Sequence, residues 1–178
     1  MQMSTSLRKK RAAEAAKAAG VDALLVTHLP DVRYLSGFTG SSAALILTNG
    51  APRRAVLFTD GRYTAQARAE AAGTRVVIAP KPLQAACEWI VKHRVKRCGF
   101  EAAQTTVASL SAMRKAVTGA SKPKSSKPKF VAVKPLVARL REIKDAEEIQ
   151  DVYKRQACRG LGAMTTRVPA ASARAWAV

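Results

Sequence analysis

Short apolar runs and amphipathic stretches of helical length follow one another along the chain. A strand alternates between apolar and polar residues when one face of its sheet meets water, and is apolar throughout when both faces are covered. The first three runs are nearly continuous and occupy residues 23–27, 43–48 and 54–59. Further strands are predicted at residues 74–79, 98–101 and 130–134. We therefore predict a mixed β-sheet of about five to six strands, covered on both faces.

Helical segments separate these strands. Ser4 or Ser6 can cap a first helix, and Gly20 suits the position just after its end. Further helices are predicted from the turn after residue 59 to Gly73, at residues 83–95 and at residues 106–117. The NGAP turn between the second and third strands predicts a hairpin. Strands interleaved with helices indicate an α/β fold with helices on both faces of the sheet.

Two stretches interrupt this pattern. Residues 28–42 are rich in turn formers, so we expect no regular element there. Residues 119–129 carry Lys, Ser and Pro without an acidic residue, which is typical of a solvated loop.

The last part of the chain changes in character. Asp145 could cap a helix, with Glu148 in the capping-box position. Beyond Val152 there is no acidic residue and no sustained helical stripe. We therefore expect a domain at residues 1–135, a linker and the start of a helix at residues 136–151, and a non-native or disordered tail at residues 152–178.

The charge of the chain is unusual, because 31 Lys and Arg residues against 12 Asp and Glu residues give a formal charge of +19. Basic stretches at residues 7–11, 92–97 and 122–129 could neutralise phosphates. Few aromatic residues accompany them, so bases would find little to stack on. A solvated basic surface is favoured and nucleic acid is not expected as a partner, but a small basic nucleic-acid-binding protein remains the alternative.

Cysteine usage and hydropathy bear on the compartment. The three cysteines are widely spaced and form no CxxC motif, which favours a reducing compartment. Glu14 and Lys17 interrupt the basic N-terminus where a signal peptide would need its apolar core. No run approaches the roughly 18 apolar residues of a membrane span. We expect a cytoplasmic protein with no membrane partner.

Candidate catalytic chemistry is sparse. His28 and His93 are the only histidines, and no acid–histidine cluster has the spacing of metal ligands. Ser36, Ser41 and Ser42 lie near His28 in sequence, but no G-x-S-x-G motif occurs. Neither phosphate-binding glycine motif is present. The sequence therefore predicts neither catalytic residues nor a metal site in this chain.

The segment DGRY stands at a junction between a predicted strand and a predicted helix, where α/β proteins often place functional residues. Asp60 is expected to cap the turn, which Gly61 would permit. Arg62 could pair with Asp60 or a neighbouring carboxylate. Tyr63 could pack its ring and expose its hydroxyl. Spacing alone favours a structural role for all four.

Four segments, in this order, resemble the N-terminal domain of the creatinase/prolidase family, especially that of bacterial Xaa-Pro aminopeptidases. They are PDVRYLSGFTGSSAALIL at residues 30–47, LFTDGRYTAQA at 57–67, TRVVIA at 74–79 and LVARLREIKDAEEIQ at 136–150. The resemblance covers about residues 5–150 and implies that domain's fold, with its ribonuclease H-like motif. Asp31 departs from the pattern, since family members often carry Asn at this position.

The resemblance implies a metallopeptidase whose chemistry lies in a C-terminal pita-bread domain. There, two Asp, one His and two Glu hold two divalent ions of the Mn type, which activate water to cleave an Xaa-Pro bond. None of those ligands can be placed on this sequence, so we expect a truncated chain that is inactive alone.

By the same resemblance, the domain caps the active site and supports a homodimer. Arg62 and Tyr63 are then candidates for contact with a proline-containing peptide or with the partner subunit, while Asp60 and Gly61 set the turn. A stand-alone interaction module remains a further alternative. The substrate stays open, because prolidase, creatinase and lyase relatives share this domain.

Overall fold

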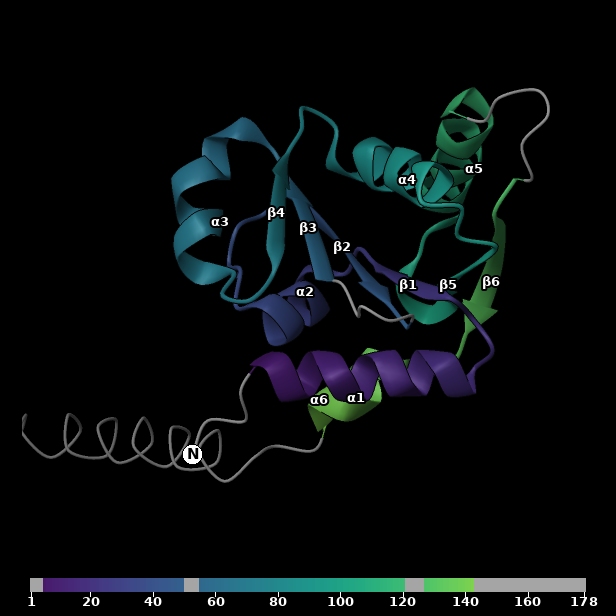
Figure 1. Cartoon of the computed structure of the whole chain (residues 1–178), viewed down its shortest axis with the longest axis horizontal. Helices are drawn as coiled ribbons and strands as arrows, with labels where there is room; N and C mark the ends of the chain where they lie inside the picture. Colours follow the sequence, from purple (N-terminus) through teal and green to yellow (C-terminus); the bar gives the residue numbers. More distant parts are fainter. Residues whose placement is uncertain (1–4, 50–54, 121–126, 143–178) are drawn as a thin grey trace, which may run out of the picture. The chain divides into compact units, whose positions relative to one another are not determined.

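A mixed sheet forms the centre of the structure, which is a computed structural model that describes residues 5–49, 55–120 and 127–142. Within these residues the sheet has six strands in the order β4-β3-β2-β1-β5-β6 (Figure 1). The strands are β1 (Ala23–Val26), β2 (Ala43–Thr48), β3 (Ala55–Thr59), β4 (Arg75–Ile78), β5 (Arg97–Glu101) and β6 (Lys129–Val133). The predicted mixed sheet is confirmed.

The strand directions bring one set of ends together. β2 runs antiparallel to both β1 and β3, which confirms the predicted hairpin. β1 pairs in parallel with β5, β3 with β4, and β5 with β6. Every strand except β2 therefore points the same way. As a result, the carboxyl ends of β1, β3, β4, β5 and β6 share one edge of the sheet with the start of β2.

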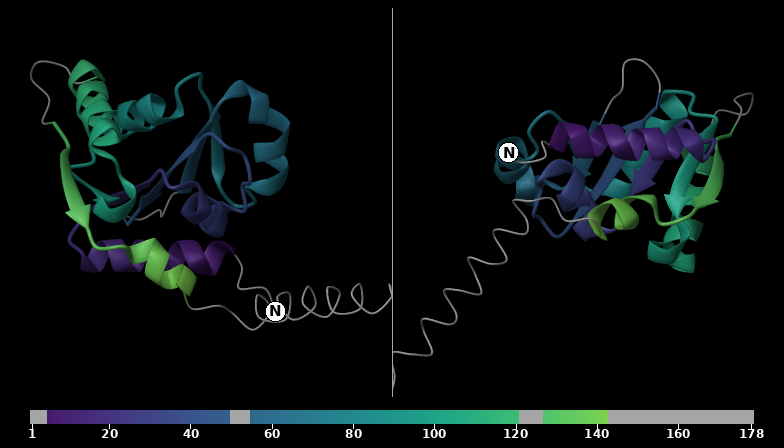
Figure 2. Two further views of the ribbon diagram at one scale, coloured as in Figure 1. Left: turned by 180° about the vertical axis from the view of Figure 1, so that it is seen from behind. Right: turned by 90° about the horizontal axis from the view of Figure 1, so that it is seen from below.

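Helices cover both faces of this sheet (Figures 1 and 2). They are α1 (Thr5–Ala18), α2 (Leu29–Ser36), α3 (Thr64–Glu70), α4 (Pro82–Lys92), α5 (Val107–Ala120) and α6 (Leu136–Glu142), with short 3₁₀ turns η1 (Gly61–Tyr63) and η2 (Ala102–Gln104). One core lies between the sheet and α1, α2 and α6, and a second lies between the sheet and α4 and α5.

Successive strand residues supply opposite cores. Leu24 and Val26 of β1 belong to the core under α1, whereas Ala23 and Leu25 belong to the core under α4. Since side chains alternate between the faces of a strand, a strand between two helical layers must be apolar at every position. This geometry explains the continuous apolar runs of the sequence.

The expectation of an irregular segment at residues 28–42 is wrong, because α2 lies within it. Pro30 sits in the first turn of α2, where a missing N–H costs no hydrogen bond. Val32 and Leu35 are fully buried and hold the helix to the core. Gly37 ends it with φ of 83°, a left-handed conformation that favours glycine. The Pro and Gly that look like breakers therefore mark the two ends of a helix.

Several expected features fall elsewhere or outside the described residues. The helix predicted at residues 83–95 is α4, which ends at Lys92, and the helix predicted at 106–117 is α5, which continues to Ala120. The expected cap at Asp145, the capping-box residue Glu148 and the tail at residues 152–178 lie outside the described residues. The first residues of the expected linker, 136–142, form α6, whose Val137 is fully buried in the core under α1.

Candidate functional site

The DGRY segment lies at the edge of the sheet where the carboxyl ends of five strands meet. β3 ends at Thr59, which is fully buried and whose hydroxyl donates to the Ser42 carbonyl, 2.7 Å away. This bond joins the end of β3 to the loop that enters β2. In α/β proteins, ligands bind at this kind of edge. The fold therefore places the candidate residues beside the loop of residues 37–42.

Asp60 caps the turn, as predicted. Its Oδ1 accepts a hydrogen bond from the Arg62 amide at 3.1 Å, and its carboxylate accepts two more from Arg62 Nε and Nη2 at 3.0 and 2.9 Å. The Arg62 side chain, by its hydrogen bond above all, lowers the pKa of Asp60 to about 2. The Arg62 side chain remains 73% exposed. Asp60 thus fixes the direction of an exposed guanidinium.

Gly61 is not needed for this turn, contrary to the expectation that it permits it. Its φ is not positive, and a Cβ added there would meet no atom within 4 Å. Any small residue fits the position.

Tyr63 joins the turn to the loop of residues 37–42. Its ring packs edge-on against Phe38, with the centroids 5.6 Å apart. Its hydroxyl lies 2.6 Å from that of Ser41, and this hydrogen bond is the main cause of the lowered pKa of Tyr63. Arg62 also lies over the ring, at 5.4 Å from its centroid. The predicted ring packing is confirmed, while the hydroxyl is engaged with Ser41.

A second set of polar contacts holds the same loop to α3. The Thr39 amide donates to Glu70 Oε2 at 2.8 Å, and the Thr39 hydroxyl donates to Glu70 Oε1 at 2.9 Å. Gln66 Nε2 donates to the Thr39 hydroxyl at 2.7 Å and to Glu70 Oε1 at 3.1 Å. The Thr39 amide is the main cause of the lowered pKa of Glu70. Sequence reasoning missed this network, although Gln66 belongs to the quoted TAQA segment.

The serines and the histidine near this edge in sequence have hydrogen-bond partners of their own. The Ser36 hydroxyl donates to the Val32 carbonyl at 2.7 Å, and Ser41 is bonded to Tyr63. His28 Nδ1 lies 2.7 Å from Asp31 Oδ2. These contacts do not join a nucleophile to a base. This edge of the sheet therefore presents to a ligand an exposed guanidinium, held in a fixed direction beside a tyrosine ring.

The residues at hand do not fit the two metal ions that the family resemblance implies. Among residues 5–49, 55–120 and 127–142, no three His, Cys, Asp or Glu side chains are grouped so that they could hold a metal ion. His93 stacks on Trp89 with the ring centroids 3.8 Å apart. No metal-dependent step is therefore assigned to the described part of the chain.

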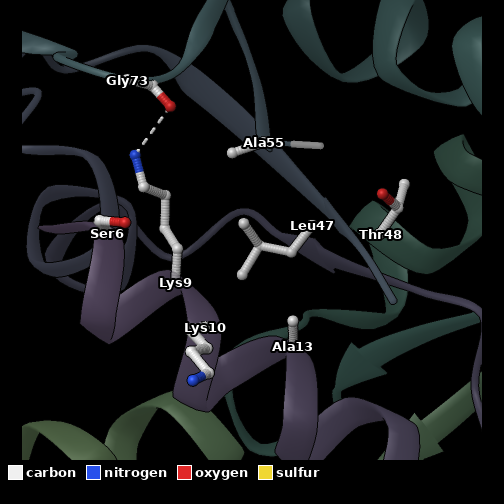
Figure 3. A pocket seen from close by; sticks show the side chains of 8 residues that line it. All are labelled: Ser6, Lys9, Lys10, Ala13, Leu47, Thr48, Ala55 and Gly73. Carbon is white, nitrogen blue, oxygen red and sulfur yellow. Dashed lines mark hydrogen bonds between the residues drawn. The ribbon is translucent and has the colours of Figure 1, made fainter. Parts of the chain in front are cut away.

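The first basic stretch is engaged within the domain. Lys9 Nζ donates to the carbonyls of Ala72 and Gly73 at 3.2 and 3.0 Å and to the Thr74 hydroxyl at 2.9 Å. Figure 3 shows Lys9 reaching from α1 to Gly73 across a pocket. Burial lowers the pKa of Lys9. Arg8 stacks over Tyr34, 4.5 Å from the ring centroid. Both cations fasten α1, which leaves less of this stretch for phosphates.

Cys87 and Cys98 are buried and free, and burial raises the pKa of Cys87 to about 12 and raises that of Cys98 as well. Of the helices in the described ranges, none has the length and apolarity needed to cross a bilayer.

Comparison with known proteins gives the family. The model of the Creatinase/Prolidase N-terminal domain matches residues 8–143. The uncharacterized peptidase YqhT of Bacillus subtilis (strain 168) is 30% identical over 132 residues, which are 74% of this chain and 34% of YqhT. The chain thus spans about one third of the length of this curated relative.

Two solved structures have the same fold. The N-terminal domain of the cytoplasmic peptidase PepQ from Mycobacterium tuberculosis H37Rv is 34% identical, with a TM-score of 0.68 over 75% of this chain and 98% of that one. An Xaa-Pro aminopeptidase from Streptococcus pyogenes is 30% identical, with a TM-score of 0.67 over 79% of this chain and 100% of that one. The chain belongs to the creatinase/prolidase family, of which it carries the N-terminal domain.

Proposed function

We propose that this chain is the non-catalytic N-terminal part of a longer Xaa-Pro peptidase of the cytoplasm. The observation that carries the proposal is the match to the Creatinase/Prolidase N-terminal domain over residues 8–143. Two further findings support it. The chain corresponds to 34% of YqhT, which is called a peptidase, and its fold is that of a chain called an Xaa-Pro aminopeptidase.

In this proposal the polar edge of the sheet borders the entrance of a catalytic domain, and the full-length enzyme is a homodimer. Residues 136–151 connect the two domains, and α6 is the first part of this connection. Two divalent ions of the Mn type, bound by the catalytic domain, would supply activated water. This chain supplies walls and contacts, because its described residues hold no such ligand set.

Arg62 and Tyr63 are the proposed contacts with substrate or with the partner subunit. A guanidinium recognises carboxylates through paired N–H donors. Arg62 donates hydrogen bonds to Asp60 through Nε and Nη2, and its side chain is still 73% exposed. It therefore presents positive charge in a fixed direction, which suits the terminal carboxylate of a short peptide or an acidic side chain of the partner.

The test uses this chain alone and a chimera. In the chimera, residues 5–142 replace the matching N-terminal part of YqhT. With Mn²⁺ present, we expect no hydrolysis of an Xaa-Pro dipeptide or a longer Xaa-Pro peptide by the chain alone, and hydrolysis of at least one of them by the chimera. Which peptide is cleaved separates a prolidase-like from an aminopeptidase-like enzyme. Hydrolysis by the chain alone would contradict the non-catalytic role.

Arg62→Ala in the chimera tests the contact. We expect KM to rise severalfold or the dimer to weaken, as measured by steady-state kinetics and sedimentation. Arg68→Ala is the matched control, because Arg68 is exposed on α3. If Arg62→Ala leaves KM, kcat and dimerisation as they are in the control, Arg62 has no role beyond the turn.

A further inference from the structure

α6 is fastened to the domain over a buried acidic pair. Its apolar anchor is Val137, which is fully buried, with Leu136 and Leu140 partly buried beside it. α6 packs against α1 and α2. Near it lie Asp31, with 0% exposure, and Glu101, with 5%. No other carboxylate in the described ranges is buried.

Polar side chains of the domain form hydrogen bonds and an ion pair with α6 along its length. Near its start, the Val137 amide donates to Glu101 Oε1 at 2.5 Å. Further along, the Tyr34 hydroxyl donates to the Leu140 carbonyl at 3.1 Å. Near its end, Arg141 Nη1 lies 3.5 Å from Asp31 Oδ1. The helix is therefore joined to α2 and β5 by directional contacts as well as by apolar packing.

The two carboxyls have few partners for their charge. Asp31 Oδ1 and Glu101 Oε2 are buried, and neither accepts a hydrogen bond from the described residues. A buried carboxylate oxygen without a donor is costly, and protonation relieves that cost. Burial first, and the charge of Asp31 in addition, raise the pKa of Glu101, although hydrogen bonds from the Val137 and Leu136 amides and the charge of His28 oppose the rise.

Three charged or titratable groups lie around the pair, from α6, from α1 and from the residue before α2. Arg141 of α6 is the cation at Asp31, and its side chain is 38% exposed. His28, just before α2, contacts Asp31 Oδ2 but carries charge only when protonated. Arg8 of α1 lies over Tyr34. Arg141 forms the ion pair at Asp31, whereas no cation of the described residues forms an ion pair with Glu101.

We propose that α6 is a proton-dependent latch, docked while the buried Glu101 carboxyl holds a proton and loosened when it is ionised. On loosening, the proton goes to solvent and the Glu101 carboxylate gains water. Because α6 is the last helix of the described residues, the latch sets how firmly this end of the domain is held.

The direction of the pH dependence of α6 docking follows from proton linkage. The pKa of Glu101 in the docked state lies above the value of 4.5 expected for an exposed Glu. The docked state therefore holds more protons than the undocked state between these two pKa values, and docking weakens as the pH rises through the higher one. For one proton, the docking constant falls by at most about tenfold per pH unit.

Hydrogen exchange on the 178-residue chain tests the latch. Protection of the α6 amides, corrected for intrinsic exchange rates, is measured between pH 5 and 8. We expect it to fall with rising pH by up to about tenfold per unit across the titration of Glu101, while amides of α4 show no such fall. Glu101→Gln should keep α6 protected and remove the dependence, because a neutral amide can still accept from Val137. Glu88→Gln, at an exposed position on α4, is the matched control and should behave as wild type.

Either of two results would overturn the latch: constant protection of α6 in the wild type, or a wild-type slope in Glu101→Gln. If Glu101→Gln does not fold, the carboxyl ¹³C resonance of Glu101 in the wild type decides. A Glu101 pKa above the ordinary value of 4.5 supports the latch, and a pKa at or below that value refutes it.

Discussion

Two glycines of the candidate site should respond in opposite ways to the same substitution. Gly37 closes α2 with φ of 83°, and a Cβ added there would lie 2.9 Å from the carbonyl oxygen of Glu70. Gly61, in the DGRY turn, has no positive φ and open space around an added Cβ. Comparing the two alanine variants therefore separates a backbone requirement from mere presence in a family motif.

The magnitude for Gly37→Ala follows from two costs. A left-handed conformation costs a non-glycine residue about 1–2 kcal/mol. The close approach is to a backbone atom, which cannot rotate away, and overpacking of this kind costs about 1–3 kcal/mol. Moving Glu70 would also disturb its bonds to Thr39. We expect a loss of about 2–5 kcal/mol in the free energy of unfolding.

Gly61→Ala should instead be neutral or should stabilise the chain by about 0.5 kcal/mol, because alanine restricts the unfolded chain more than glycine does. Urea denaturation of both variants, followed by circular dichroism, gives the free energies from midpoints and slopes. An equal loss of unfolding free energy in the two variants would contradict this expectation. So would a Gly37→Ala variant that is as stable as the wild type.

Contacts of Asp60, Lys9 and Arg8 at the surface of the domain can be tested separately. The pKa of Asp60 is lowered to about 2, so its pairing with Arg62 stabilises the fold above the ordinary Asp value of 3.8, and most of this stabilisation is lost by pH 2. Asp60→Asn should therefore lower Tm at pH 6 and by much less at pH 2, and an equal deficit at both pH values would contradict this. Lys9→Met keeps the apolar stem and removes three hydrogen bonds, so we expect a loss of about 1–2 kcal/mol in urea denaturation, with Lys10→Met as the control that should change little. Since Arg8 and Lys9 are engaged in the domain, fluorescence anisotropy should show only weak binding of duplex DNA at 0.15 M salt, and submicromolar binding there would revive the nucleic-acid alternative.

The part of the fold that follows from local pattern could be predicted from the sequence. Continuous apolar strands predicted a sheet covered on both faces, because a strand's alternating side chains must then meet two cores. Leu24 and Leu25 show this directly, since they belong to different cores. The Asp60 cap was predictable for the same reason, because Asp60 and Arg62 are close in sequence and need no distant partner. Family motifs added the identity of the domain.

Tertiary structure decided the contacts that join distant residues. The parallel pairing of β1 with β5 joins Ala23 to Cys98, and no local signal states which strands will be neighbours. α2 was missed because Pro30 and Gly37 break a helix in its interior but start and end one at its termini, and only the packing of Leu35 shows which applies.

The same division holds within the sites. Thr39 meets Glu70, and Glu101 meets the Val137 amide, across 31 and 36 residues of chain. In sequence these are ordinary polar residues without a spacing that links them. Their contacts form because the sheet brings the ends of β3 and β5 to one edge, where residues of α3 and α6 also lie. The strands, the capped turn and the family can be predicted from neighbouring residues and motifs, whereas the network at Glu70 and the buried pair under α6 exist only through the packing of helices on the sheet.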